Sequence, residues 1–147
     1  MKRDVAEMVT EAALVVARGG DYAAVVLADN KPLIRWWEKN VGSLHPNVIA
    51  HHMTIVFQPS ETVLESVAIG EHVDLNVIGY GHDDKCQAVV VKGYPSKNKV
   101  AHITVATNGV GAVYSNKLLA KGWEKVEGPK LQGRIGYDNG DGKMKYG

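Results

Sequence analysis

The second half of the chain alternates apolar and polar residues with a period of two, which is typical of strands that bury one face. Residues 71–80 show this alternation most clearly. Residues 85–91 return after the turn formed by residues 81–84, so the two segments predict a β-hairpin. Short runs rich in β-branched residues predict further strands at residues 22–28, 50–57, 100–106, 123–126 and 131–137.

Three other segments favour helices. Residues 3–18 repeat apolar residues at helical spacing before a Gly-Gly pair, and a helix capped by Asp29 or Asn30 is expected to run to about Asn40, with Pro32 in its first turn. Residues 115–121 predict a short helix that ends at a glycine, whereas residues 60–69 fit either a helical turn or irregular structure. Helices interspersed among more numerous strands predict an α+β fold. We expect one domain over residues 1–137, with the N-terminal helix at 3–18, and a flexible Gly-rich tail at 138–147.

The composition is that of an ordinary globular protein, with 45% hydrophobic and 22% charged residues. A formal net charge of +1 gives no global attraction to nucleic acid, and no apolar run approaches the roughly 20 residues needed to span a bilayer. Since Cys86 is the only cysteine, an intramolecular disulfide and a cysteine-built zinc site are not expected. We therefore expect a cytoplasmic protein, with no membrane partner, no obligate protein partner and no cofactor.

One short motif occurs twice in the predicted strands. His52-Met53-Thr54-Ile55 and His102-Ile103-Thr104-Val105 are both His-x-Thr followed by a β-branched apolar residue. Residues two apart in a strand point to the same face, so each histidine should project together with its threonine while the apolar residues face the core. A single copy is most simply a coincidence in a half-buried strand, but two copies in the same context favour a functional pair.

Paired histidines suit phosphodiester hydrolysis. That reaction needs a base to activate the nucleophile and an acid to protonate the leaving oxygen, and histidine can do either near neutral pH. Threonine hydroxyls can donate hydrogen bonds to the non-bridging phosphate oxygens. We therefore assign catalysis to His52 and His102, and phosphate binding to Thr54 and Thr104, with no metal required.

With these motifs the sequence resembles the two-histidine (2H) phosphoesterase superfamily, from about Tyr22 to about Tyr137. The second motif, followed by Ala112-Val113-Tyr114-Ser115-Asn116, is similar to the cyclic phosphodiesterase domain of fungal-type tRNA ligases and their viral and phage relatives. The resemblance implies a bilobal fold in which antiparallel sheets line a central cleft and helices pack outside. It also implies a nucleotide or RNA end as substrate, with a 2′,3′-cyclic phosphate as the preferred bond.

Five further residues are candidates for substrate binding, each with a structural alternative. Ser115 either caps its helix or places a backbone amide near phosphate, and Tyr114 either stacks on a base or packs in the core. Lys97 and Lys99 either lie in a solvated turn or steer the phosphate, and Trp36, next to Trp37, either packs or offers a stacking surface.

The remaining polar candidates carry less weight. His51 should point away from His52, toward the core, and His45 most simply lies in a loop without a role. Arg35 and Arg134 are phosphate ligands by residue type alone. Three residues with side-chain oxygens near the C-terminal end lack the spacing of a calcium loop: Asp138, Asn139 and Asp141.

Two other functions remain open. A small chain without ligase or kinase domains also fits a phage-type hydrolase of cyclic oligonucleotide messengers of bacterial immunity, an anti-defence role that would place it in the host cytoplasm. A non-catalytic nucleotide or RNA binder that kept the fold is the third interpretation, although both motifs are intact.

Overall fold

The computed structural model describes residues 22–147, so the helix expected at residues 3–18 lies outside the described residues. Within the described part, all strands belong to one antiparallel sheet. Six of them close into a barrel in the order β6-β3-β1-β8-β4-β5, because β5 also pairs with β6. Their bounds are β1 Tyr22–Leu27, β3 His52–Phe57, β4 His72–His82, β5 Cys86–Lys92, β6 His102–Thr107 and β8 Lys130–Asp138.

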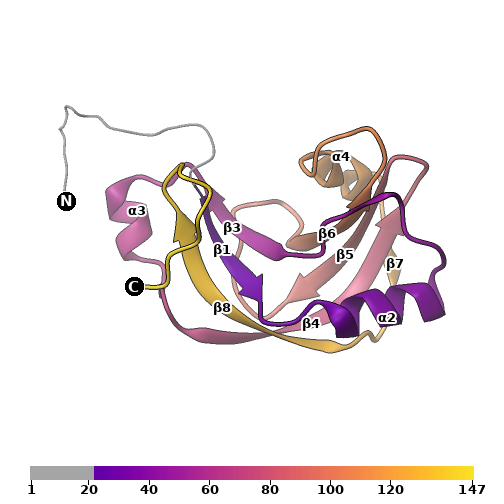
Figure 1. Cartoon of the computed structure of the whole chain (residues 1–147), viewed down its shortest axis with the longest axis horizontal. Coiled ribbons are helices and arrows are strands. Elements are labelled where there is room, and N and C mark those ends of the chain that lie inside the picture. Colours follow the sequence, from indigo (N-terminus) through magenta and orange to yellow (C-terminus); the bar gives the residue numbers. More distant parts are fainter. Residues whose placement is uncertain (1–21) are drawn as a thin grey trace.

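Five short elements complete the described chain. The two-residue strand β2 (Asn47–Val48) pairs with β6, and β7 (Glu124–Lys125) pairs with β4. The helices α2 (Lys31–Asn40), α3 (Glu61–Glu65) and α4 (Tyr114–Ala120) have 10, 5 and 7 residues. Figure 1 shows α2 along β4 and α4 over β5 and β6, on opposite sides of the molecule.

The fold class predicted from the sequence is wrong. The α+β arrangement of two lobes with a central cleft and helices packed outside is replaced by a single, mostly β barrel. The physical reason lies in the two long strands. With 11 and 9 residues, β4 and β8 each extend far enough to pair with both neighbours, so the sheet closes on itself instead of dividing.

One apolar core fills the barrel. Its fully buried side chains include Val25 from β1, Met53 from β3, Ile103 from β6 and Ile135 from β8, and Trp37 of α2 joins them. A smaller cluster lies outside the barrel, where Leu118 and Leu119 of α4 cover Cys86, Ala88 and Val90 of β5. Helix α4 therefore shields only part of the outer surface, over β5 and the buried strand β6, and its cluster does not extend to β3 and β1.

Most individual elements agree with the sequence pattern. The β4–β5 hairpin, the helix with Pro32 in its first turn and the short helix before Gly122 are confirmed. The ambiguous segment at residues 60–69 begins as α3, capped by the Ser60 hydroxyl, which accepts a hydrogen bond from the Val63 amide at 3.2 Å. The segment after β8 turns back, and Lys145 pairs with Tyr137. No helix within residues 22–147 is long and apolar enough to cross a bilayer.

Candidate active site

The two His-x-Thr motifs lie on strands β3 and β6, which are neighbours in the barrel. Met53 pairs with Ile103, and both side chains point into the core. His52 and Thr54, and His102 and Thr104, therefore project from the outer surface of the barrel, as the strand alternation predicted. Together these four side chains line one cavity of about 570 Å³.

Each motif is followed by a β-bulge at the same position. In β3, Thr54 pairs with Ala24 and Val56 with Ala23, so Ile55 is the extra residue. In β6, Thr104 pairs with Ala88 and Ala106 with Gln87, so Val105 is the extra residue. A bulge changes which face the following residues occupy. Phe57 consequently lies on the outer face with His52 and Thr54, opposite Tyr22, and it lines the cavity.

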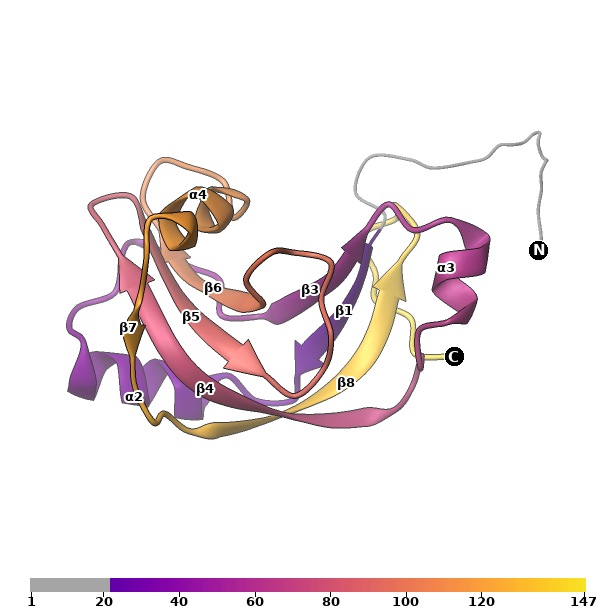
Figure 2. The same ribbon diagram turned by 180° about the vertical axis from the view of Figure 1, so that it is seen from behind.

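Strands β3 and β6 separate beyond their single pairing because the β5–β6 loop contacts the edge of β3. The Ser96 hydroxyl donates a hydrogen bond to the Thr54 carbonyl at 2.7 Å, and the Lys97 amide donates to the Ile55 carbonyl at 2.7 Å. Figure 2 shows this loop between β5 and β6 next to β3. The loop thus holds the two motifs apart and leaves room for a ligand between them.

His102 is oriented by the backbone. Its Nδ1 lies 2.7 Å from the carbonyl oxygen of Val100, and since a carbonyl only accepts, Nδ1 carries the proton. Nε2 is left as the reactive nitrogen. Burial lowers the pKa of His102, while the hydrogen bond to Val100 opposes this by stabilising the charged form.

His52 is paired with its sequence neighbour. The Nδ1 atoms of His51 and His52 are 2.9 Å apart, so one ring donates to the other. Burial, with smaller contributions from His51 and His102, lowers the pKa of His52 to about 4. His52 is therefore neutral at neutral pH, and its Nε2 is the nitrogen not engaged by His51.

The expectation that His51 points away from His52 toward the core is wrong. His51 is exposed, and its ring stands at 84° to that of His52 with centroids 5.1 Å apart. The cause is the preceding residue: Ala50 has φ of 41°, in the left-handed region that non-glycine residues rarely adopt. The strand begins only at His52, so the alternation cannot be extended back to His51.

Thr104 belongs to a buried network. Its Oγ1 lies 2.8 Å from the Ser115 hydroxyl and 3.3 Å from the Ala112 carbonyl, and Ser115 Oγ lies 3.2 Å from Cys86 Sγ. Ser115 is fully buried and does not line the cavity, and its hydroxyl does not cap α4. Since a carbonyl only accepts, the Thr104 hydroxyl donates its hydrogen to Ala112 and accepts from Ser115, and a ligand oxygen would have to take the place of the Ala112 carbonyl.

The other four candidates lie outside the cavity lining. The Tyr114 hydroxyl donates to Asp83 at 2.9 Å, which directs the ring away from the motifs. Lys97 and Lys99 are exposed in the β5–β6 loop, where the intervening Asn98 lines the cavity instead. Trp36 packs against Tyr80, with ring centroids 6.2 Å apart, as part of the α2 contact with the barrel.

The remaining polar candidates from the sequence also lie outside the cavity that contains the two motifs. His45 Nε2 lies 2.8 Å from the Asp83 carbonyl, and Arg35 is exposed on α2. Arg134 lies on β8 beside a different cavity. The carboxylate of Asp138 accepts the Gly140 amide at 2.7 Å and the Gly142 amide at 3.2 Å, which forms the turn after β8.

Sequence reasoning missed the apolar rim of the cavity. Phe57 is 62% exposed and Val113 is 77% exposed, although large apolar side chains usually avoid solvent. Tyr22 contributes a third wall, with its ring centroid 5.0 Å from that of His52. Only the bulge at Ile55 reveals that Phe57 shares a face with His52, and a bulge has no signal in a single sequence.

This constellation defines a class of site, in which two neutral, oriented histidines and two hydroxyls surround a cavity with an apolar rim. The family model of the fungal tRNA ligase phosphodiesterase domain matches residues 39–138. The chain therefore belongs to this family, which confirms the resemblance seen in the sequence and indicates a phosphodiesterase with an RNA substrate. No curated protein and no solved structure matches the chain.

Proposed function

We propose that the chain is a metal-independent 2H-type phosphodiesterase that hydrolyses a 2′,3′-cyclic phosphate on an RNA end or nucleotide. The observation that carries the proposal is the convergence of His52, His102, Thr54 and Thr104 on one cavity, in a chain of the phosphodiesterase family. Two histidines supply both proton transfers that the reaction needs, and the hydroxyls supply hydrogen bonds to phosphate.

The contacts of the two rings favour His52 as the base and His102 as the acid. A lowered pKa keeps His52 neutral, and in the tautomer in which His52 Nδ1 donates to His51 the free Nε2 takes a proton from the attacking water as the new oxygen–phosphorus bond forms. The Val100 carbonyl stabilises a positive charge on His102, whose Nε2 gives a proton to the departing ribose oxygen as that phosphorus–oxygen bond breaks. A phosphate anion in the cavity favours the charged form of a nearby imidazole, which supports the role of His102 as the acid.

The threonines and the apolar rim bind the substrate. Thr104, accepting from Ser115, donates to a non-bridging oxygen in place of its long bond to the Ala112 carbonyl, and Thr54 faces the same space from β3. Phe57 and Val113 offer an exposed apolar surface beside the histidines, which suits a nucleobase. A phosphate between the motifs and a base on the rim are the two parts of a terminal nucleotide.

Hydrolysis of a substrate panel in EDTA tests this proposal. The panel holds 2′,3′-cyclic mononucleotides, an RNA with a cyclic phosphate end and 3′,5′-linked cyclic dinucleotides. We expect turnover of the 2′,3′-cyclic substrates, reduced about 10²–10⁴-fold in His52→Ala and in His102→Ala. His82→Ala, which removes an exposed histidine stacked on Tyr80, is the matched control and should retain activity.

The other outcomes of the panel select among the rivals. Preference for cyclic dinucleotides would move the assignment to messenger hydrolysis. Tight binding of RNA without turnover, unchanged in His52→Ala, would identify a binding module. Turnover that EDTA abolishes would refute the metal-independent mechanism.

A substrate with a good leaving group separates the acid from the base. The p-nitrophenolate anion leaves without protonation, so hydrolysis of a p-nitrophenyl phosphodiester should need a base but no acid. We expect His102→Ala to retain most activity on this substrate and His52→Ala to lose it. The reverse pattern would exchange the two roles.

A further inference from the structure

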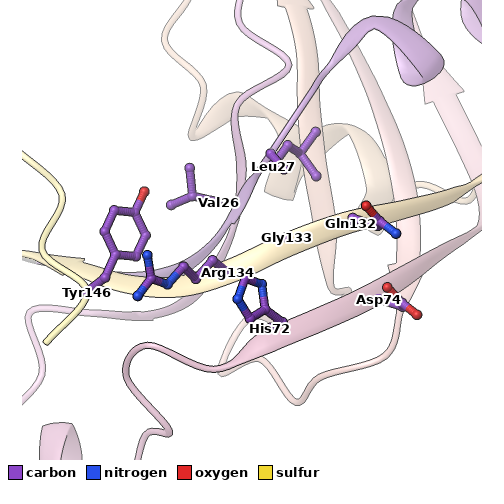
Figure 3. A pocket seen from close by; sticks show the side chains of 9 residues that line it. Val26, Leu27, His72, Asp74, Gln132, Gly133, Arg134 and Tyr146 are labelled. Atoms are coloured by element: carbon purple, nitrogen blue, oxygen red, sulfur yellow. The ribbon is translucent and has the colours of Figure 1, made fainter.

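A second cavity, of about 680 Å³, lies on the other side of β1 from the histidines. Figure 3 shows Arg134 at its centre, between Tyr146 and His72, with Gln132 and Asp74 toward the opposite end. Val26 also lines this cavity.

Strand register places the two cavities on one face of the sheet. Val26 of β1 pairs with His52 on one side and with Arg134 on the other, and Arg134 pairs in turn with His72 of β4. Directly paired residues point to the same face. His52 and Arg134 are therefore two strand spacings apart, about 10 Å between Cα atoms.

The surface between the cavities is aromatic. The outward residues of β1 there, Ala24 and Val26, are buried, and Ala24 pairs with Gly136 of β8. The Tyr146 ring lies over Gly136, where an added Cβ would meet it at 2.9 Å. Tyr22, Tyr146 and Arg134 thus follow one another away from His52, an alternation of aromatic and basic groups that suits single-stranded nucleic acid.

Arg134 is held in place by contacts that leave its terminal guanidinium nitrogens able to donate hydrogen bonds to a ligand. Its Nε donates to the Gly70 carbonyl at 3.2 Å, and its guanidinium lies 4.8 Å from the centre of the Tyr146 ring. Neither contact engages the terminal guanidinium nitrogens, which can donate to a phosphate in a fixed geometry. Asp74 lies two residues beyond His72 on β4, toward the end of the cavity that is farther from Tyr146.

We propose that Arg134, with Tyr146 and His72, forms a second subsite that binds the phosphate of the RNA chain preceding the reactive end. This inference rests on the proposed function, since it assumes that the reactive phosphate lies between the histidines. The enzyme would then prefer a cyclic phosphate on an oligonucleotide to the same group on a mononucleotide, because only the oligonucleotide reaches across β1.

Comparing substrate lengths in the Arg134→Ala variant tests the subsite. We expect kcat/KM of the wild-type protein to be higher for an oligoribonucleotide with a 2′,3′-cyclic end than for the cyclic mononucleotide. Arg134→Ala should lower kcat/KM about tenfold on the oligonucleotide, mainly through KM, and leave the mononucleotide unchanged. Lys130→Ala removes an exposed charge from the same strand, away from the cavity, and should change neither value.

A binding measurement keeps the test independent of turnover. Fluorescence anisotropy with an oligoribonucleotide ending in a 3′-phosphate should show weaker binding by Arg134→Ala. The slope of log K against log salt concentration is negative, and it should be less steep by about 0.7 in Arg134→Ala than in the wild-type protein. This is the value for one phosphate contact on a single strand. An unchanged slope, or equal losses on mononucleotide and oligonucleotide, would overturn the subsite. If the wild-type protein turned over none of the substrates while Arg134→Ala still reduced the salt dependence of binding, that result would count against the proposed function and leave the subsite supported.

Discussion

The clearest quantitative consequence of the site is that protonating His52 should destabilise the fold. Its pKa is about 4 in the folded protein and about 6.5 in an unfolded chain. Between these values the unfolded chain binds a proton that the folded site does not, so stability is fully present above pH 6.5 and falls as the pH decreases toward 4. A difference of 2.5 pKa units at 1.36 kcal/mol each gives at most about 3 kcal/mol of lost unfolding free energy.

Urea unfolding at several pH values, for the wild-type protein and His52→Gln, isolates this contribution. His102 has a lowered pKa in the same direction, but both proteins contain it, so most of its contribution cancels in the difference. We expect the unfolding free energy of the wild type relative to the variant to decrease by up to about 3 kcal/mol from pH 7 to pH 4. Parallel curves for the two proteins, or an NMR titration of His52 with a pKa near 6.5, would refute the reasoning.

Three substitutions test other parts of the structure. Ser115→Ala removes the hydroxyl 2.8 Å from Thr104 Oγ1, and we expect a loss of about 1 kcal/mol in urea unfolding with several-fold lower kcat/KM; full activity would exclude the network from phosphate binding. Phe57→Ala should leave stability almost unchanged, since the ring is 62% exposed. It should raise KM for nucleotides roughly tenfold, because the ring is expected to contact the base. An unaltered KM would show that the base does not bind at the rim. Gly93→Ala places a side chain at a φ of 140°, where its Cβ would collide with the Asp74 carbonyl. The melting temperature should fall by several degrees, corresponding to about 2 kcal/mol or more. An unchanged melting temperature would contradict the close approach of Gly93 to the Asp74 carbonyl.

The sequence predicted local structure well where one strong rule determines it. The period of two in the motif strands placed Met53 and Ile103 in the core and brought His52 and His102 to the outer face. The period also identified the β4–β5 hairpin. These predictions depend only on neighbours in the chain, which a single sequence displays directly.

The errors come from features that depend on distant contacts or rare backbone conformations. The barrel needs non-local pairs such as β1 with β8, which are more than 100 residues apart, and nothing in either strand alone specifies that partner. The position of His51 follows from the positive φ of Ala50, a residue type that gives no sign of such a conformation. Burial of Ser115 follows from packing of α4 on β5, which turns its hydroxyl toward Thr104 and Cys86.

The single register pair between β3 and β6, Met53 with Ile103, has a consequence for how the molecule acquires activity. The motifs are 50 positions apart in the sequence, and this pair is the only register contact between their strands. Non-local pairing of this kind carries a loop-closure entropy cost and tends to form late in folding. Any intermediate with the hairpins in place but with β3 and β6 still unpaired would contain every catalytic side chain and yet no assembled site. Recovery of turnover during refolding therefore reports on completion of the barrel, while circular dichroism also reports the strands formed earlier.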